Sequence, residues 1–256
     1  MNSDLQILKT FEPISLSEMD QVTLMNRKDT KYFFDKSKLN GILYELRPDY
    51  RLLEIKGEQL FSYQNIYFDT KDFFCYTQHH NRRVNRYKIR IRKYVESDLV
   101  FLEVKFKKNT GRTIKSRIQL AEFSYVLNDV AKKFIRENTP FNPDELFPTL
   151  YNEFKRFTLV NRNMHERATI DTDLVLQITG EERKFSRLCI AELKIDSSLS
   201  GSKFRLAMRD NFCPEMRISK YSVGIAYMYP DLKQNNFKSK KIRINRIENV
   251  YTTPST

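Results

Sequence analysis

The stretch NRYKIRIRKY, residues 85–94, alternates cations with tyrosine or isoleucine. The cations are Arg86, Lys88, Arg90 and Arg92. Alternate side chains of a β-strand point to opposite faces, so all four would share one face. Cations two residues apart lie about 7 Å from each other and repel by roughly 0.6 kcal/mol in water, or about 2 kcal/mol at an effective dielectric constant near 20. Such a row tolerates water but requires an anion if it is enclosed.

The composition indicates a globular chain with a polyanionic partner. The 256 residues are 40% hydrophobic and include 19 Phe and 14 Tyr, which is enough for a large core. With six Gly and eight Pro, the chain is not a linker-rich or low-complexity protein. The 45 Lys and Arg residues against 32 Asp and Glu give a net charge of +13. This excess favours nucleic acid, an anionic membrane surface or phosphate-rich small molecules as partners.

The cysteines and the N-terminus predict a cytoplasmic protein. Cys75, Cys189 and Cys213 are far apart and odd in number, so neither a disulfide framework nor a structural zinc site is expected. The first residues lack the basic-then-apolar order of a signal peptide. No apolar run approaches the ~18–20 residues of a membrane span, so we expect at most peripheral contact with the cytoplasmic membrane.

The pattern along the chain predicts one domain over residues 1–234, followed by a basic, loosely held tail over 235–256. Besides 85–94, strands are expected at 99–108, 112–120, 166–178 and 188–196, and helices at 122–138, 142–154, 202–212 and 220–229. The run KSKKIRINR in the tail is by default a solvated segment, but it could also guide polyphosphate or touch an anionic membrane.

Five other strands repeat the division into a charged and an apolar face. They are NRKDTKY (26–32), LEVKFK (102–107), TIKSR (113–117), ERATID (166–171) and AELKID (191–196). For one strand, a wet face of an ordinary antiparallel sheet is the better interpretation. Across six strands that interpretation weakens, because the faces prefer Arg and Lys and repeat Glu-x-Lys at 103–105 and 192–194. We therefore expect an α+β fold: an antiparallel β-barrel of about eight strands, cationic inside, with helices packed outside and a C-terminal helix closing or lining the tunnel.

The chemistry of this interior suits a triphosphate. Arginine presents fork-shaped donors that match phosphate oxygens, and lysine supplies a compact charge. Carboxylates Glu103 and Glu192 could hold Mg²⁺ or Mn²⁺, which prefer oxygen ligands. A nucleic-acid-binding sheet is disfavoured, because such sheets carry aromatic side chains on the ligand face, whereas Tyr87 and Phe106 fall on the opposite face.

Eight short motifs carry a resemblance to a known family. In chain order they are RKDTKY (27–32), YFDT (67–70), YTQH (76–79), RYKIRIRKY (86–94), EVKFK (103–107), ERATID (166–171), ELK (192–194) and SKYS (219–222). Together they resemble the VTC domain, the catalytic domain of vacuolar transporter chaperone polyphosphate polymerases. That domain belongs to the triphosphate tunnel metalloenzymes, a CYTH-like superfamily. The resemblance runs from about Arg27 to Tyr229.

The resemblance implies a polyphosphate polymerase that transfers the γ-phosphate of ATP to a growing polyphosphate chain inside the tunnel, with Mn²⁺ or Mg²⁺. The catalytic residues implied are Arg90, Arg92, Lys105 and Lys220. The phosphate- or nucleotide-binding residues implied are Lys31, Arg86, Lys88, Lys107, Lys115, Arg117, Arg156, Arg167, Lys194 and His79. Glu192 and Glu103 would hold the metal, while Asp171 could be either a hydrogen-bonding residue or a ligand. Coupling to membrane transport would need a separate membrane protein, and the oligomeric state stays open.

Two other functions remain open at this point. A tripolyphosphatase or nucleoside triphosphatase of the same fold would transfer the phosphoryl group to water, and such hydrolases line the tunnel with more carboxylates. A non-catalytic polyphosphate- or nucleotide-binding protein would not need Glu192, which is present here. The cationic lining therefore favours the polymerase.

Overall fold

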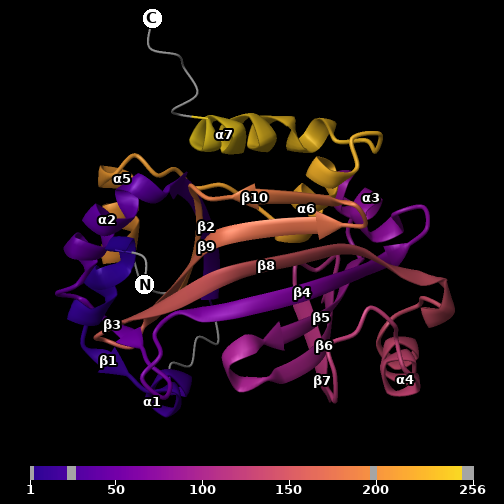
Figure 1. Cartoon of the computed structure of the whole chain (residues 1–256), viewed down its shortest axis with the longest axis horizontal. Helices are drawn as coiled ribbons and strands as arrows, with labels where there is room; N and C mark the ends of the chain where they lie inside the picture. The colour runs from indigo at the N-terminus through magenta and orange to yellow at the C-terminus, as the bar shows by residue number, and fades with distance from the viewer. Residues whose placement is uncertain (1–2, 22–26, 197–200, 250–256) are drawn as a thin grey trace, which may run out of the picture.

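The structure, a computed structural model, describes residues 3–21, 27–196 and 201–249 (Figure 1). Its strands are β1 (Pro13–Ile14), β2 (Arg27–Asp35), β3 (Tyr50–Leu53), β4 (Phe61–Thr70), β5 (Arg86–Tyr94), β6 (Leu99–Lys107), β7 (Thr113–Leu120), β8 (Leu146–Asn161), β9 (Glu166–Ile178), β10 (Glu181–Phe185) and β11 (Leu188–Asp196). Its α-helices are α1 (Leu16–Asp20), α2 (Leu39–Leu46), α3 (Phe74–His80), α4 (Asp129–Asn138), α5 (Lys203–Asp210), α6 (Lys220–Met228) and α7 (Lys238–Glu248). Short 3-10 helices are η1 (Ser3–Thr10), η2 (Lys36–Lys38), η3 (Val95–Ser97), η4 (Pro143–Glu145) and η5 (Asn235–Phe237).

The described strands form one 11-stranded sheet, which confirms the predicted α+β class. The main order is β2-β11-β9-β8-β4-β5-β6-β7, with antiparallel neighbours throughout, and the short pair β1 and β3 is parallel. The two end strands, β2 and β7, do not pair with each other, so the sheet is not closed by hydrogen bonds. It is nevertheless curved, because Lys31 of β2 acts electrostatically on Lys88 of β5, five places along the order.

The outer face of the sheet is apolar and covered by helices, as the alternation predicts. On one side α2, α5 and η1 pack on residues such as Phe34, Phe157 and Leu193, all of them buried. On the other side α4 packs on β5 and β6, where Ile89 and Ile91 are 0% and 1% exposed. Each cationic strand therefore buries its apolar face outward and turns its charges toward the concave face.

Helix α6 occupies part of the concave face and fits the predicted C-terminal helix. Its Gly224 lies so close to β8 that a Cβ there would meet Leu150 Cδ2 at 2.5 Å. A bulge in β9 at Asp173, where φ is 53°, reverses the side-chain alternation. Asp171, before the bulge, faces the charged interior, whereas Leu174, after it, packs in the apolar cluster around α6. The charged part of the interior is thus limited at one end by an apolar cluster.

Three predicted segments differ in the structure. The helix expected over 122–138 begins only at Asp129, as α4. The helix expected over 142–154 is wrong: after η4 this segment belongs to the long strand β8. The loosely held tail expected from residue 235 is also not observed over 235–249, where Phe237 and Ile244 are buried and α7 contacts β2, β11 and α6. Residues 250–256 lie outside the described residues. No helix in the described part has the length and apolarity that a membrane crossing requires.

Candidate phosphate-binding site

The concave face gathers most of the residues predicted for the site. Lys31 comes from β2; Arg86, Lys88, Arg90 and Arg92 from β5; Glu103, Lys105 and Lys107 from β6; Lys115 and Arg117 from β7; Arg156 from β8; Arg167 and Asp171 from β9; Glu192 and Lys194 from β11; His79 from α3; and Lys220 from α6. Seven strands and two helices that are distant in sequence thus contribute side chains to one curved surface.

Arg90 and Arg92 have different partners. Arg90 binds Glu103 through Nε and Nη2 at 2.7 and 2.6 Å and donates from Nη1 to the Tyr67 hydroxyl at 3.2 Å. Burial alone would raise the pKa of Glu103, but Arg90 and Arg92 hold it below its usual value, so this carboxylate is ionised. Arg92 donates from Nε to Asn65 at 2.8 Å and has no carboxylate within ion-pair distance among the described residues.

Asp171 holds two cations from different elements. Arg156 grips it with Nε and Nη2 at 2.5 and 2.9 Å, and the Lys220 amine at the start of α6 contacts the same carboxylate. Burial alone would raise the pKa of Asp171, but Arg156 and Lys220 lower it below its usual range. Of the two roles left open for Asp171, the hydrogen-bonding role is the one these contacts display.

Glu192 lies between two lysines. Its Oε1 is 3.0 Å from the Lys194 amine and its Oε2 is 3.1 Å from the Lys31 amine. Although burial would raise its pKa, these two cations hold the pKa well below the usual value. No group of three or more His, Cys, Asp or Glu side chains that could hold a metal occurs in the described part of the chain. Glu192 and Glu103 are therefore single ionised carboxylates in a cationic surface rather than members of a metal cage.

Lys88 and Lys105 lie opposite each other on β5 and β6 without a neutralising partner. Lys88 bonds to the Ser219 hydroxyl at 2.6 Å, and neither lysine has a carboxylate within ion-pair distance among the residues described. Burial lowers the pKa of Lys88 well below its usual value, and the charges of Lys105 and Lys31 lower it further. Desolvation, followed by Lys115 and Lys31, lowers the pKa of Lys105 to about 8. These shifts mark a place where positive charge exceeds negative charge.

A short polar chain connects this place to α3. The ring of His79 contacts the Ser222 hydroxyl, which lies 3.4 Å from the Ser219 hydroxyl. Burial lowers the pKa of His79 to about 2, with contributions from Lys88 and Arg86, so the ring is neutral. The sequence interpretation gave no role to either serine. The motif SKYS (219–222) contained both, and their spacing of three at a helix start was the available signal.

The remaining predicted residues lie at the margins. Arg86 donates to the Arg83 carbonyl at 2.7 Å where β5 begins, and Lys107 is its cross-strand partner. Arg117 lies over the Phe101 ring at 4.9 Å, and Arg167 is aligned with Lys194. The positions of the aromatic side chains differ in part from the prediction that they lie opposite the charges. Tyr63 and Phe154 lie on the inner face under Arg156, and their ring centroids are 5.0 and 5.3 Å from its guanidinium.

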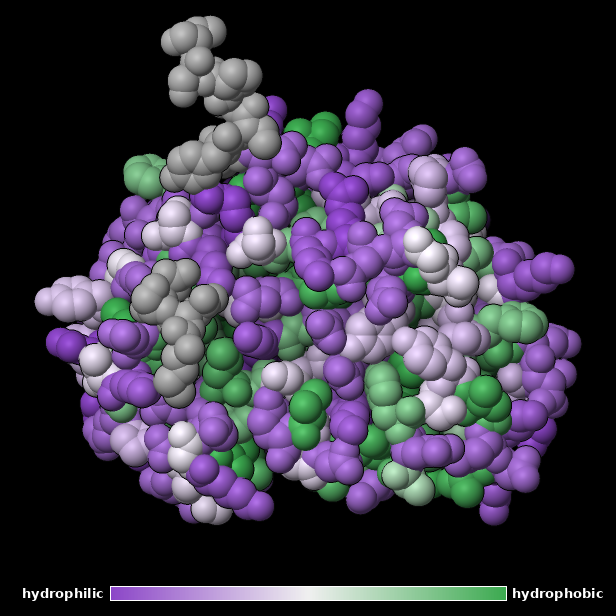
Figure 2. Space-filling view, viewed as in Figure 1, coloured by the Kyte–Doolittle hydropathy of each residue, from purple (hydrophilic) through white to green (hydrophobic). Residues whose placement is uncertain are grey.

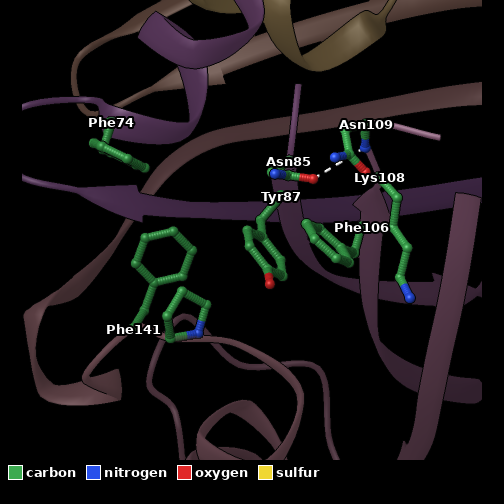
Figure 3. A pocket seen from close by; sticks show the side chains of 8 residues that line it. Phe74, Asn85, Tyr87, Phe106, Lys108, Asn109 and Phe141 are labelled. Carbon is green, nitrogen blue, oxygen red and sulfur yellow. Dashed lines mark hydrogen bonds between the residues drawn. The ribbon is translucent and has the colours of Figure 1, made fainter. Parts of the chain in front are cut away.

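Tyr87 and Phe106, on the outer face of the sheet, border a cavity of about 410 Å³ (Figure 3). Tyr87 and Phe106 stack at 4.3 Å, and Phe141 meets Tyr87 edge-on at 5.5 Å. Lys108 is the one charged side chain among the described residues that line it. The lining of this cavity is mainly aromatic, and it includes none of the residues predicted for the phosphate-binding site.

Comparison with known proteins decides the family. The family model described as the VTC domain matches residues 26–229. The chain belongs to the VTC domain family. The family predicted from the sequence motifs is thus confirmed, and the whole charged surface, from Lys31 to Lys220, falls within the matched region of this VTC domain.

Solved structures resemble this VTC domain only distantly, and no curated protein matches it. The PH1819 protein from Pyrococcus horikoshii OT3 is 14% identical with a TM-score of 0.46, covering 79% of this chain and 98% of that one. A putative adenylate cyclase from Vibrio parahaemolyticus is 12% identical with a TM-score of 0.46, covering 80% and 99%. A putative adenylyl cyclase from Hippeastrum, described as having a dominant triphosphatase activity, is 14% identical with a TM-score of 0.44, covering 79% and 96%. Similarities this weak carry no argument about activity.

The lowered pKa of Lys105 predicts that this VTC domain takes up protons when it binds a polyphosphate anion. In the free protein Lys105 loses its proton near pH 8. A bound anion raises the pKa of a lysine, so between the free and bound pKa values the complex holds more protons. Calorimetry with tripolyphosphate at pH 8.5 and pH 6.5, in buffers of different ionisation heat, measures the protons exchanged by wild type and by Lys105→Met. Protons lost by the ligand are common to both proteins, so wild type should take up more protons than Lys105→Met at pH 8.5, with a smaller difference at pH 6.5, and equal exchange at pH 8.5 would contradict the prediction.

Proposed function

We propose that this VTC domain is a polyphosphate polymerase that transfers the γ-phosphate of ATP to the end of a polyphosphate chain. The observation that carries the proposal is the set of unneutralised cations on the concave face. Lys88 and Lys105 come from adjacent strands and have no ion-pair partner among the described residues, and the charge of Lys31, which Glu192 pairs, adds to their mutual repulsion, as the lowered pKa values of Lys88 and Lys105 record. A chain of phosphates would replace this repulsion by attraction. Since ATP is the donor, the cytoplasm is the compartment that we propose.

The residues support transfer mainly through position and charge. Arg90 is fixed by Glu103 and Tyr67, and Arg92 by Asn65, so both guanidinium groups are oriented before substrate binds. Preorganised cations that stabilise charge on the transferring phosphoryl group supply much of the catalysis in such reactions. The acceptor is the terminal oxyanion of the chain, which needs no base, and His79 is neutral and engaged with Ser222.

A divalent cation fits this site as a companion of the nucleotide. Mg²⁺ and ions like it are commonly held by one or two carboxylates together with substrate phosphates. Glu192 and Glu103 are ionised and lie on the charged face, so they are the residues that would hold the ion. When bound, Mn²⁺ or Mg²⁺ would neutralise part of the phosphate charge.

The direct test combines purified protein with ATP and Mn²⁺, and resolves the products on a gel stained for polyphosphate while free phosphate is followed. Arg90→Ala and Glu192→Ala run beside the wild type. We expect long chains from the wild type and at least about a hundredfold less from either variant, as for loss of a preorganised charged group.

The other outcomes identify the rival functions. Release of free phosphate without chains would indicate a triphosphatase that uses water as the acceptor. Binding of ATP or tripolyphosphate that Arg90→Ala weakens, with neither product formed, would indicate a non-catalytic binding protein. Lys133→Ala is a suitable control, because Lys133 is an exposed residue of α4 on the outer side of the sheet.

A further inference from the structure

A second group of cations lies outside the concave face, on α7 and on the turn between α3 and β5. Asn236, just before α7, bonds to Nε2 and the carbonyl of His80 at 3.2 and 2.8 Å, which brings the start of α7 to the turn that carries Arg82. Burial and the charge of Arg82 lower the pKa of Lys240 of α7. Burial and the charge of Arg183 of β10 likewise lower the pKa of Lys241. We call Arg82, Lys240, Lys241 and Arg183 the outer cations. Arg183 and Lys241 both lie near the Tyr227 ring, at 4.4 and 5.0 Å, which holds this pair together.

Packing of the α7 region against the rest of the protein holds these like charges near one another. Phe237 and Ile244 anchor the α7 region with 5% and 1% exposure, and the hydroxyl of Tyr227 binds Asn245 at 2.9 Å. In the described part of the chain, none of the four outer cations has a carboxylate within ion-pair distance. The Lys241 amine donates to the Ala226 carbonyl at 2.9 Å and to Gln234 Oε1 at 2.5 Å. The side chains of Arg82 and Lys240 have no hydrogen-bond partner among the described residues, so this like-charged pair indicates a polyanionic ligand.

The outer cations continue from the concave face. The Phe237 ring lies between the two groups, with its centroid 6.1 Å from the His79 ring and 5.1 Å from the Lys240 amine. The charges of Lys88, Arg86 and Lys240 all help to lower the pKa of His79. The turn that carries Arg82 is also tied to β5, because Arg86 donates to the Arg83 carbonyl. Figure 1 shows α7 lying over β10 and α6, at one side of the curved sheet. Cations thus run from Lys88 past Arg86 to Lys240.

We propose that the outer cations bind the part of a long polyphosphate chain that extends beyond the concave face. This inference rests on the proposed function. It also assigns a role to α7, which lies beyond the residues 26–229 matched by the family model. A membrane surface fits less well. Membrane-binding helices place several aromatic or aliphatic side chains beside their cations. Among the described residues, the exposed large apolar side chain that α7 carries is Ile242. Hydrophilic side chains predominate around α7 in Figure 2.

The test measures binding of supplied chains, so that it does not depend on synthesis. Tripolyphosphate and polyphosphate of about 60 units are titrated into wild type and Arg82→Glu/Lys240→Glu. The control is Lys9→Glu/Lys133→Glu, which makes the same charge change at exposed residues of η1 and α4, away from α7. We expect long-chain affinity to fall about tenfold in the α7 variant alone, because two attractive contacts become repulsive. Tripolyphosphate affinity and melting temperature should change little.

Three results would overturn the inference. Equal loss of long-chain binding in both double variants would show that only the net charge of the protein matters. Unchanged long-chain binding in the α7 variant would show that Arg82 and Lys240 do not contact the chain. Loss of binding to phosphatidylserine vesicles with unchanged long-chain binding would assign the surface to a membrane instead. If wild type binds neither chain, the proposed function fails as well. If Arg90→Ala loses tripolyphosphate binding but the wild type does not prefer long chains, only the outer contact fails.

Discussion

Replacing Arg92 with methionine is expected to lower polyphosphate synthesis about 10²–10³-fold while the protein remains folded. The Arg92 side chain lies between the Tyr63 and Tyr94 rings, at 5.2 and 5.9 Å, and one hydrogen bond to Asn65 fixes it. Methionine preserves most of the apolar contact and leaves no carboxylate unpaired. The loss should therefore appear in the initial rate at saturating ATP and in tripolyphosphate affinity, with a small change in melting temperature.

Arg90→Met provides the contrast. Arg90 neutralises Glu103, and its removal leaves a partly buried carboxylate without its ion-pair partner. That variant should lose stability as well as activity. Arg92→Lys should retain part of the activity, because lysine keeps the charge but loses the fork. A near wild-type rate of Arg92→Met would show that Arg92 is not a catalytic residue. If Arg92→Met did not fold, the contacts of the guanidinium with Asn65 and the two tyrosines would be needed for folding.

The faces of the central strands were predictable because they depend on local alternation alone. In β5 and β6, each cation or Glu103 alternates with a residue such as Ile89 or Val104, and the structure places the two sets on opposite faces. No distant contact is needed for this inference. The same pattern also predicted that the charged faces point inward, because a continuous apolar face must be covered by helices on the outside.

Where bulges interrupt the alternation, the sequence misled. In β8 the buried residues Leu146, Leu150 and Phe154 are four apart, which imitates one face of a helix. A regular strand would place all three on one face, but Leu146 packs in the cluster with α4 and the other two in the cluster around α6, because the pairing of β8 shifts register opposite Tyr67/Phe68. The basic run of α7 misled for another reason: its helix depends on packing by Phe237 and Ile244 against distant elements.

The partners of the charged residues could not be predicted at all. Glu192 faces Lys31 because β11 pairs with β2 in one particular register, over a separation of 161 residues. Asp171 meets Lys220 only because α6 enters the concave face. The sequence thus identifies which residues share the charged face, whereas the register of distant strands decides which of these cations have a carboxylate partner and which do not.

Asp171→Asn is expected to be the most destabilising single change at the site. Asp171 is 4% exposed and neutralises both Arg156 and Lys220, which are 17% and 14% exposed. Removing the carboxylate charge from such a buried group costs about 3–5 kcal/mol, because the two cations are left unpaired. For a chain of this size the melting temperature should fall on the order of 10 °C. Tripolyphosphate should restore part of the loss, since it supplies the missing negative charge.

The pH dependence has a defined sign. The pKa of Lys220 is already lowered to about 8 by burial even with Asp171 present, and without the carboxylate it falls further below its value in the unfolded chain. A lysine with a lowered pKa in the folded state destabilises the fold below its unfolded pKa, and this cost shrinks as the pH rises toward about 10. The difference in stability between Asp171→Asn and wild type should therefore narrow as the pH rises to about 8, and it should stay level above that, where Lys220 is neutral in both folded proteins.

Asp173→Asn is the matched control for this change. Asp173 lies two residues along β9 and also contacts two lysines, Lys36 at 3.0 Å and Lys155 at 3.9 Å, but its side chain is 32% exposed. Ion pairs with that access to water contribute about 1 kcal/mol or less, and asparagine tolerates the positive φ at this position. Urea unfolding of both variants would separate the two sites. Equal losses, or a loss for Asp171→Asn that grows with pH, would mean that the buried cations are not what Asp171 stabilises.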